Sequence, residues 1–225
     1  MITTLENVLK RTTSHPVIDP SIEHEFYTPL DLSIDNPNLL LVDVSSPVGI
    51  QNYINSQLQK HKAKLAFGGY LEERSIYNRS KYFNNSVLAV NRNIHLGLDL
   101  WISAGTRVHS PLDGILHSFK NNTNFGDYGP TIILEHKLEG YVFYTLYGHL
   151  SLESLEDKQI GQEIRQGQNI ATLGEASVNG EYAPHLHFQI IKDLQGNKGD
   201  YPGVSSKQDV DFYKLNCPDP QFLLF

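Results

Sequence analysis

The first third of the chain is mostly polar and contains one run of apolar residues at helical spacing. Between Ile50 and Leu58 the apolar positions lie three or four residues apart, which places them on one face of a helix. Ser46 is a favoured N-cap residue, and Pro47 is favoured at the first helical position. The pattern therefore predicts an α-helix over residues 47–62.

Two neighbouring segments complete the picture of this first part. The stretch "IDNPNLLLVDV", residues 34–44, passes from a turn into an apolar run, which predicts a short strand. The stretch "SIYNRSKYFNNS", residues 75–86, is polar and rich in Asn, which is typical of a connector. We expect a small α/β N-terminal extension with one helix over residues 1–85. A β domain with a C-terminal tail is expected over residues 86–225.

The second part consists of short β runs separated by glycine. Residues 105–116 and 161–174 are alike, because each begins with Gly and a polar residue and then has a strand, a turn and a second strand. Two such units indicate an internally duplicated β architecture. Between them, residues 130–150 read as a β-hairpin that turns at Glu139-Gly140. The sequence therefore predicts a mainly β fold.

A pair of histidines lies in the strand-like run "PHLHFQII", residues 184–191. Side chains alternate between the two faces of a strand, so His185 and His187 share one face with Gln189, opposite apolar residues that suit a core. Two imidazoles so placed can converge on one ion. Alternatively, one binds the ion while the other attends its bound water.

Two more segments carry similar chemistry. Alternation also puts His95 and Asp99 on one face, but a straight strand would hold them roughly 13 Å apart. The chain must therefore bend or bulge near Gly97, which glycine tolerates. At the end of the later strand "YVFYTLYGHL", alternation predicts that Tyr147 and His149 share a face.

These residue types suit zinc. A catalytic zinc commonly has three protein ligands, drawn from imidazoles and carboxylates, plus a water. His95, Asp99 and one histidine of the pair would meet that need. Metal coordination lowers the pKa of a bound water, and the remaining histidines could then orient that water, take its proton and stabilise an oxyanion.

Charge and composition exclude several classes of partner. The chain has 18 Lys and Arg against 25 Asp and Glu and no basic stripe, so nucleic acid is not an expected partner. No apolar run is long enough to cross a bilayer, so no membrane insertion is expected. The single cysteine, Cys217, and the lack of a visible signal peptide predict a soluble, cytoplasmic protein, or a periplasmic or secreted one if a leader was removed. The sequence does not indicate an oligomeric state.

The order "HLGLD … YTLYGHLS … GQEIRQGQ … PHLHFQI" closely resembles the lysostaphin-type (LytM-like, beta-lytic) zinc metallopeptidases over roughly residues 90–192. That family has His-x-x-x-Asp, then Tyr-Gly-His, then His-x-His. The resemblance implies an antiparallel β-sandwich built from a duplicated β motif. The segments "FGGYLEERSIYN" and "DYGPTIILEH" are also similar to a leaderless subgroup whose peptidase-like domains are sometimes fused to aminotransferase-like enzymes.

By position, the resemblance assigns the zinc ligands to His95, Asp99 and His187. It implies that His149 and His185 help to activate water and stabilise the transition state, with Tyr147 as a supporting donor. The activity it implies is a metalloendopeptidase, a hydrolase that cleaves peptide bonds with metal-activated water, in peptides or cross-links of the peptidoglycan type. In related enzymes an N-terminal segment can maintain latency, so residues 1–85 could cover the groove or lend a ligand, although a packing extension is the preferred interpretation.

Other readings of the same motifs remain. The glucose-specific phosphocarrier domain has a similar fold, and one of its histidines accepts a phosphoryl group, but it does not need His149 or the His185/His187 pair. A cupin would have Glu soon after its His-x-His, where this chain has Gln189. A catalytically silent metal-binding module also stays open. Of the remaining histidines, which match no signature position, three are expected to be structural or near-site residues: His109, His117 and His136. No role is expected for the three in the first part: His15, His24 and His61.

Overall fold

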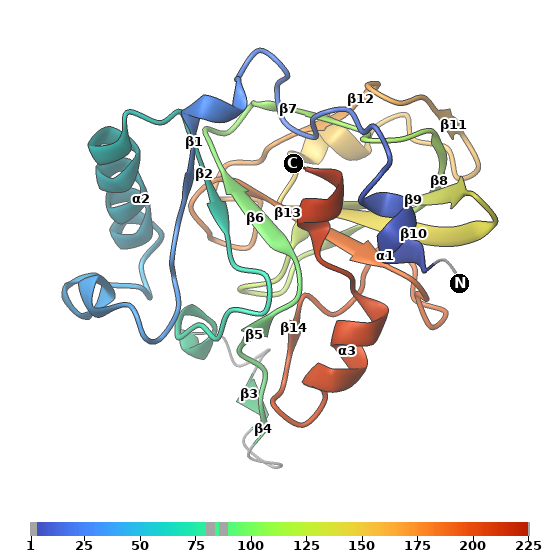
Figure 1. The fold of residues 1–225 in the computed structure, drawn as a ribbon. Helices are drawn as coiled ribbons and strands as arrows, with labels where there is room; N and C mark the ends of the chain where they lie inside the picture. Colours follow the sequence, from blue (N-terminus) through green and yellow to red (C-terminus); the bar gives the residue numbers. More distant parts are fainter. Residues whose placement is uncertain (1–3, 80–83, 86–89, 225) are drawn as a thin grey trace.

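The computed structural model describes residues 4–79, 84–85 and 90–224 and has a mainly β fold, as predicted (Figure 1). Its largest element is an eight-stranded mixed sheet in which only β1 and β2 pair in parallel. In spatial order the strands are β1 (Tyr27–Pro29), β2 (Leu65–Gly68), β6 (Leu98–Trp101), β13 (His185–Ile191), β10 (Tyr141–Gly148), β9 (Gly129–Leu138), β8 (Gly114–Asn122) and β11 (Glu163–Ile164).

Shorter elements surround this sheet. The two-stranded pairs are β7 (Arg107–His109) with β12 (Asn169–Thr172), β5 (Ile94–His95) with β14 (Val204–Ser205), and β3 (Asn84–Asn85) with β4 (Val90–Asn91). The α-helices are α1 (Leu5–Leu9), α2 (Pro47–His61) and α3 (Val210–Asn216). The 3-10 turns are η1 (His24–Phe26), η2 (Pro37–Leu41), η3 (Ile76–Arg79), η4 (Leu152–Leu155) and η5 (Pro220–Leu223).

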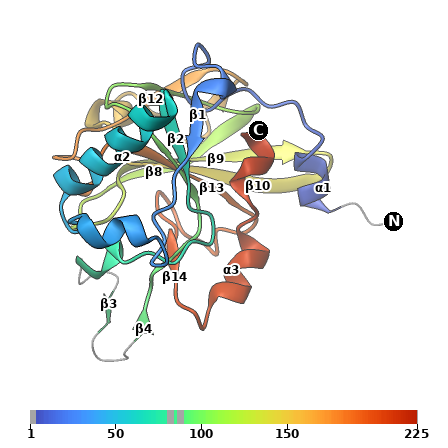
Figure 2. The same cartoon turned by 60° about the vertical axis from the view of Figure 1, so that its left-hand side comes forward.

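Helix α2 confirms the predicted helix. The Ser46 hydroxyl accepts a hydrogen bond from the Gly49 amide, and Lys62 ends the helix in the left-handed conformation. Ile50 and Ile54 are buried on the side that packs beside β1 and β2 (Figure 2). The sequence signals for the start and the apolar face of this helix are therefore confirmed.

The strand predicted over residues 34–44 is wrong, because this segment forms the 3-10 turn η2. The Asn36 side chain accepts from the amide of Asn38, and Pro37 starts the turn. Leu40 and Leu41 are 85% and 96% exposed. The apolar run has no neighbouring strand to pair with, so the local Asn-Pro capping signal decides its conformation.

The hairpin predicted over residues 130–150 is confirmed by β9 and β10. Its two turn residues, Glu139 and Gly140, both have positive φ, at 48° and 84°. A two-residue turn of this kind matches the right-handed twist of the paired strands, which is why Gly is favoured there.

The two glycine-led units pair crosswise. Strand β7 of the first unit pairs with β12 of the second, and β8 of the first pairs with β11 of the second. Each unit thus gives one strand to the large sheet and one to the small ribbon. The β-sandwich and the duplication themselves stay predictions.

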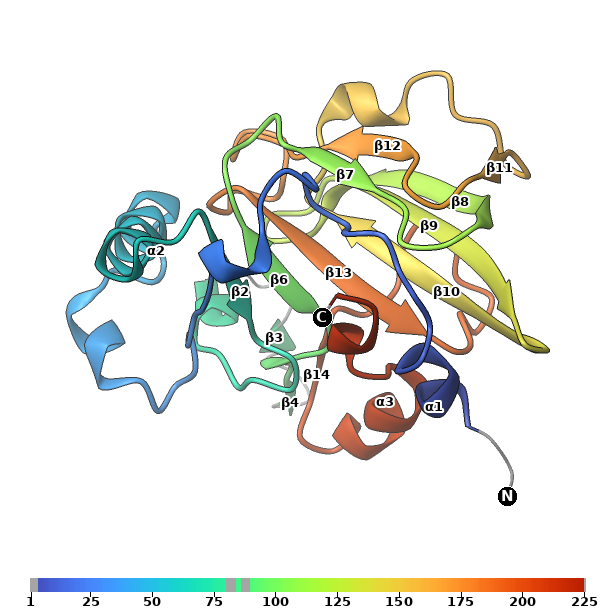
Figure 3. The same ribbon diagram turned by 45° about the horizontal axis from the view of Figure 1, so that its top comes forward.

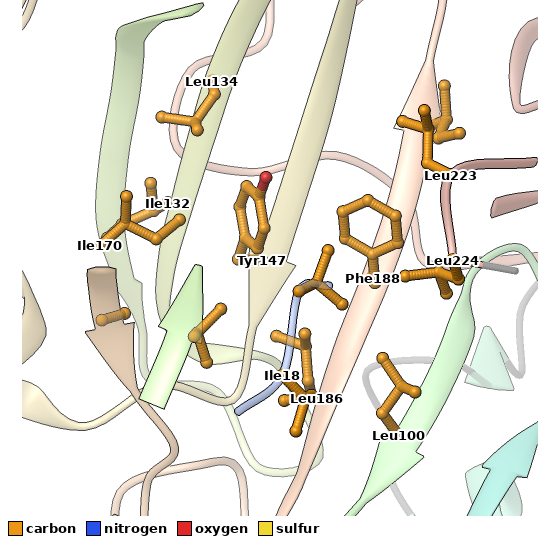
Figure 4. Close-up of a cluster of buried hydrophobic side chains, with 14 of the residues drawn as sticks. Ile18, Leu100, Ile132, Leu134, Tyr147, Ile170, Leu186, Phe188, Leu223 and Leu224 are labelled. Atoms are coloured by element: carbon orange, nitrogen blue, oxygen red, sulfur yellow. The ribbon is translucent and has the colours of Figure 1, made fainter. Parts of the chain in front are cut away.

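The main hydrophobic core lies between one face of the large sheet and the β7–β12 ribbon, and it extends to the C-terminal residues (Figures 3 and 4). Strand β13 contributes Leu186 and Phe188, which contact core residues from β6, β10 and the C-terminus, including Leu100, Tyr147 and Leu223. The opposite face of β13 is left for the histidines.

The N-terminal part belongs to the same sheet. Strand β2 pairs with β6 so that Gly68 lies opposite Asp99 and Phe67 opposite Leu100. The sheet therefore runs across residue 85, and the predicted domain boundary there stays a prediction. Among the described residues, no helix combines the length and the apolar character needed to cross a membrane.

Candidate metal centre

Strands β6 and β13 form the floor of the centre. In their antiparallel register Asp99 lies opposite His187, and Trp101 lies opposite His185. Both histidines are buried on the face opposite the core, together with Gln189, as alternation predicts. The pairing therefore brings one carboxylate and one imidazole side by side.

The predicted bend at Gly97 is confirmed. Strand β5 ends at His95 and β6 begins at Leu98, and the break brings His95 Nε2 to 3.3 Å from Asp99 Oδ1. Glycine is required at position 97 for a second reason, which the sequence did not indicate. A Cβ at Gly97 would lie 2.5 Å from the His187 ring and 2.8 Å from the Phe188 carbonyl oxygen. Only a residue without a side chain leaves room for His187.

Three potential ligand atoms converge at this point. His95 Nε2 lies 2.8 Å from His187 Nδ1, and each is 3.3 Å from Asp99 Oδ1. All three side chains are at most 3% exposed. Asp99 Oδ1 is buried and accepts no hydrogen bond. The geometry therefore brings together the three residues predicted as ligands.

Hydrogen bonds on the far side of each ring fix the histidine tautomers. His95 Nδ1 lies 2.9 Å from the Gly69 carbonyl oxygen, which can only accept, so Nδ1 carries the proton and Nε2 keeps a lone pair. His187 Nε2 lies 2.9 Å from Gln189 Oε1, and the Gln189 amide nitrogen donates to the Pro202 carbonyl. The proton of His187 is therefore on Nε2, and its Nδ1 faces the centre with a lone pair.

The centre consequently holds three electron-pair donors that face one another. Two imidazole lone pairs and a carboxylate oxygen repel each other unless they share a cation or a proton. Two nitrogens and one oxygen are the donor set that zinc accepts at a site with an open position. The residues present therefore fit a zinc ion, and Gln189 is a supporting residue that the sequence did not single out for a role.

Electrostatics keep His95 and Asp99 in the states that bind a metal. Burial lowers the pKa of His95 to about 3, although the nearby Asp99 carboxylate opposes this. Burial alone would raise the pKa of Asp99, but His95 and the Arg74 guanidinium outweigh it and hold that pKa well below its usual range. At neutral pH, His95 is therefore neutral and Asp99 ionised.

His149 and His185 form a second pair beside the ligands. Their ring centroids are 4.2 Å apart, and both line the same cavity. His149 Nδ1 donates to the Asn179 carbonyl at 2.8 Å, and His185 Nδ1 donates to the Ala183 carbonyl at 2.7 Å. Each ring therefore keeps an unprotonated Nε2. Burial, and for His149 also the neighbouring His185, lowers the pKa of both rings, so both are neutral proton acceptors.

Tyr147 does not lie at the centre, and the predicted shared face with His149 is wrong. Tyr147 lies opposite Phe188 on the core face, and its hydroxyl accepts from Thr145. Alternation ends at Gly148, because His149 has a positive φ of 64° just after β10. This left-handed residue places the His149 ring on the face of His187, which a strict strand pattern cannot predict.

A cavity of about 220 Å³ opens beside the four histidines, with aromatic walls. Tyr128 is one wall, with its hydroxyl 3.4 Å from His187 Nε2, and a Cβ at Gly203 would lie 2.0 Å from that hydroxyl oxygen. Tyr182 is another, and burial raises its pKa to about 12. The sequence gave no signal for Tyr182.

The remaining strand histidines lie apart from the cavity lining. His136 is the most buried of them, at 1% exposed, and bonds the Thr145 hydroxyl and the Asp113 carbonyl oxygen. His117 contacts Ser118 and the ring of Tyr144. Their surroundings agree with a structural role.

Comparison with known proteins gives the family. Residues 93–200 match the sequence model of peptidase family M23, and this range contains all five histidine and aspartate positions of the centre. The chain therefore contains a peptidase M23 domain of the LytM and lysostaphin type, which confirms the resemblance read from the motifs. The resemblance to the aminotransferase-fused subgroup stays a prediction.

Two curated proteins illustrate the similarity. An uncharacterized metalloprotease of Haemophilus influenzae is 32% identical over 42% of this chain and 18% of its own length. The peptidoglycan DD-endopeptidase ShyA of Vibrio cholerae is 32% identical over 50% of this chain and 24% of its own length. The chain thus spans less than a quarter of either relative.

Solved structures with detectable similarity include two peptidases. The catalytic domain of lysostaphin from Staphylococcus simulans is 25% identical, with 54% of this chain and 80% of that chain covered and a TM-score of 0.38. A zinc-containing peptidase from Vibrio cholerae is 29% identical, with 48% and 29% covered and a TM-score of 0.35.

Proposed function

We propose that this protein is a zinc-dependent metalloendopeptidase that hydrolyses peptide bonds in peptides of the peptidoglycan type. The observation that carries the proposal is the convergence of three lone-pair donors, His95 Nε2, Asp99 Oδ1 and His187 Nδ1, around one point. Family membership of residues 93–200 supports peptidase activity independently.

These three atoms are the proposed zinc ligands. Zinc, when bound there, would supply Lewis acidity toward a carbonyl group and lower the pKa of a water molecule. The protein holds the ligands ready for this, since the Gly69 carbonyl and the Gln189 amide fix the two tautomers. No rearrangement of the imidazole protons is needed.

His149 and His185 are the proposed catalytic residues. Each presents an unprotonated Nε2 on the cavity side, so either ring can take the proton of the attacking water. The ring that accepts the proton then becomes a donor for the oxyanion or for the leaving amine. The Asn179 and Ala183 carbonyls hold the rings in place and stabilise the charge that this transfer creates.

The peptidoglycan-type substrate rests on the relatives and on the cavity. The Vibrio cholerae relative is named as a peptidoglycan DD-endopeptidase, and it matches half of this chain. The cavity beside the histidines has aromatic walls at Tyr128 and Tyr182, which can pack on a peptide. The Tyr128 hydroxyl can donate a hydrogen bond to it, whereas the Tyr182 hydroxyl already donates to the Gly126 carbonyl. The cellular compartment stays a prediction.

Product analysis on defined muropeptides tests the proposal. The zinc-loaded protein is incubated with cross-linked muropeptides and with a broad peptide library, with and without a chelator, while its metal content is measured. We expect about one zinc per chain, new amino termini in the products, and loss of cleavage with the chelator. A zinc-loaded protein that cuts none of these substrates would reject the peptidase and leave the silent metal-binding module. The phosphocarrier alternative is not favoured by any relative and predicts phosphate transfer onto His95 instead.

A further inference from the structure

One short segment of the N-terminal part, residues 69–74, lies against the back of the centre. Its backbone pairs with the chain around His95, since Leu71 N donates to His95 O at 2.9 Å and His95 N donates to Glu72 O at 2.9 Å. Arg74 N donates to Asn93 O at 2.8 Å. The same segment supplies the Gly69 carbonyl that fixes the His95 tautomer.

Arg74 reaches from this segment to Asp99. Its Nη1 donates to Asp99 Oδ2 at 2.5 Å, its Nε donates to Glu72 Oε2 at 2.5 Å, and its side chain is 3% exposed. The guanidinium carbon also lies 5.5 Å from the ring centroid of Trp101. The planar group is thus fixed by a carboxylate and an aromatic ring that are not ligands.

Because Arg74 bonds one carboxylate oxygen of Asp99, the two oxygens have different surroundings. Oδ2 accepts from Arg74, while Oδ1 has no hydrogen bond and faces His95 and His187. A carboxylate held in this way offers one oxygen to a metal and cannot rotate to offer both. Arg74 does not need Asp99 for charge balance, because Glu72 already faces it as a counter-charge, and the other Glu72 oxygen accepts from the Leu32 amide.

We propose that Arg74 is a positioning residue for the metal centre, acting through Asp99, and that residues 69–74 form the outer shell of the site. The inference rests on the proposed function only in requiring that His95, Asp99 and His187 bind zinc. It gives the N-terminal part a constructive role, which differs from the latency considered from sequence. Outer-shell partners of metal ligands commonly contribute about 10- to 100-fold to metal affinity.

Gly69 leaves the space that the Arg74 guanidinium occupies. It has a φ of 102°, and a Cβ there would lie 1.8 Å from Arg74 Nη2. Gly69→Ala would therefore displace the guanidinium without removing its charge. Its methyl group would also lie 3.0 Å from His95 Nδ1, so this variant disturbs both contacts of the segment with the centre.

The test compares zinc affinity in Arg74→Met, Arg74→Lys and Gly69→Ala. Affinity is measured by competition with a chromogenic chelator, and the absorption spectrum of the cobalt-substituted protein reports the coordination geometry. Arg79→Met is the matched control, because Arg79 also comes from the N-terminal part and donates to the Glu181 carbonyl at 2.9 Å without any contact with Asp99. We expect a loss of about 10- to 100-fold for Arg74→Met, a loss and an altered cobalt spectrum for the other two test variants, and wild-type affinity for the control.

The readout separates this inference from the proposed function, since metal affinity is scored whether or not a peptide is cleaved. Zinc affinity within about threefold of wild type in a folded Arg74→Met, with an unchanged cobalt spectrum, would overturn the proposal. Arg74→Lys keeps the charge and carries the test if Arg74→Met does not fold. If neither Arg74→Met nor Arg74→Lys folds in the absence of metal, as judged by circular dichroism, then Arg74 serves fold stability. That result would also overturn the proposal.

Discussion

At the scale of single residues, the centre depends on positions where a backbone feature serves a side chain elsewhere. Gly97 makes room for the His187 ring, and the left-handed His149 turns its ring to the ligand face. Gln189 and the Gly69 carbonyl decide which nitrogen is unprotonated in His187 and His95, the two proposed ligand histidines. Local conformation therefore sets the chemistry of the site as much as residue type does.

His149→Ala is expected to separate catalysis from metal binding. The substitution removes a proton acceptor but none of the three proposed ligands, so kcat should fall by about 10²- to 10⁴-fold while the zinc content stays at wild type. His117→Ala, which removes an imidazole outside the cavity lining, is the control and should keep its activity. Steady-state kinetics and metal analysis of the two variants check this, and a His149→Ala enzyme with normal kcat would refute the assigned role.

Gly97→Ala should damage the centre without changing any ligand. Its methyl group would lie 2.5 Å from the His187 ring, so the ring or the strand must move. We expect zinc affinity to fall by at least about tenfold, as for the loss of an outer-shell contact, together with a lower thermal midpoint. Chelator competition and thermal unfolding measure the two effects. Unchanged affinity would show that the space at Gly97 is not needed.

His136 predicts a pH dependence of stability that is independent of the centre. Burial lowers the pKa of His136 to about 4, against 6.5 for an ordinary histidine. Between these values the unfolded chain binds a proton that the folded chain does not, so stability rises with pH and is lost as pH falls from 6.5 to 4. The full loss is about 3 kcal/mol, from 1.36 kcal/mol for each pKa unit.

Urea unfolding of the zinc-free wild type and of His136→Gln between pH 4.5 and 7 checks this expectation. The variant should be less stable at pH 7, because it loses the bonds to Thr145 and Asp113. Its stability should nevertheless depend less steeply on pH than that of the wild type. Equal slopes for the two proteins would show that His136 does not keep its depressed pKa.

At the scale of elements, the sequence predicted best where local and tertiary signals agree. Helix α2 has a cap, a first-turn proline and an apolar face, and the β9–β10 hairpin has alternating strands and a Glu-Gly turn. The strand predicted over residues 34–44 is wrong because this apolar run has no strand partner and two of its leucines are exposed. The local pattern of apolar and polar residues does not show which strand a segment will pair with.

The resemblance of the His-x-x-x-Asp and His-x-His segments to the family signature selects His95, Asp99 and His187 as the proposed ligands, because strand alternation alone leaves either histidine of the pair possible. The surrounding residues could not be predicted, since Arg74 and Tyr128 are brought to the centre by strand pairing and by loops distant in sequence. The predicted shared face of Tyr147 and His149 is wrong because His149 is left-handed, so its side chain leaves the alternation of the strand. Tertiary register and positive φ are the two kinds of information that the sequence pattern lacked.

The pairing of β2 with β6 predicts that residues 86–225 depend on the N-terminal part. Removing residues 1–85 would delete β1, β2 and Arg74 and expose the edge of the strand that carries Asp99. We expect the fragment to lack a cooperative unfolding transition and to bind zinc far more weakly. Calorimetry and chelator competition on the fragment and the full chain check this. A folded fragment with full zinc affinity and activity would show that the N-terminal part is only an extension.

At the scale of the whole molecule, the candidate metal centre lies at the β6–β13 pair of a large mixed sheet, and the N-terminal part contributes two strands to that sheet. The chain spans 24% of the Vibrio cholerae relative and 18% of the Haemophilus influenzae relative, so its substrate has to be established on this chain itself. The net charge of −7 gives no long-range attraction to anionic polymers.

Zinc removal should destabilise the whole fold. A ligand that binds only the folded state stabilises it by RT ln(1 + [L]/Kd), which is about 4 kcal/mol at a thousandfold excess over Kd. We expect the thermal midpoint to fall on chelation and to recover when zinc is returned. In a variant that lacks Asp99, such as Asp99→Asn, chelation should have little effect. A midpoint indifferent to zinc in the wild type would speak against a folded-state metal site.

The proposed function requires that one zinc ion be shared by two imidazoles and one carboxylate from separate β segments. Anomalous diffraction from crystals of the purified protein, recorded on both sides of the zinc absorption edge, measures this directly. The account predicts one strong anomalous peak about 2.0–2.2 Å from His95 Nε2, Asp99 Oδ1 and His187 Nδ1. Zinc-supplemented crystals with no peak at this position, or with a peak held by other residues, would contradict it.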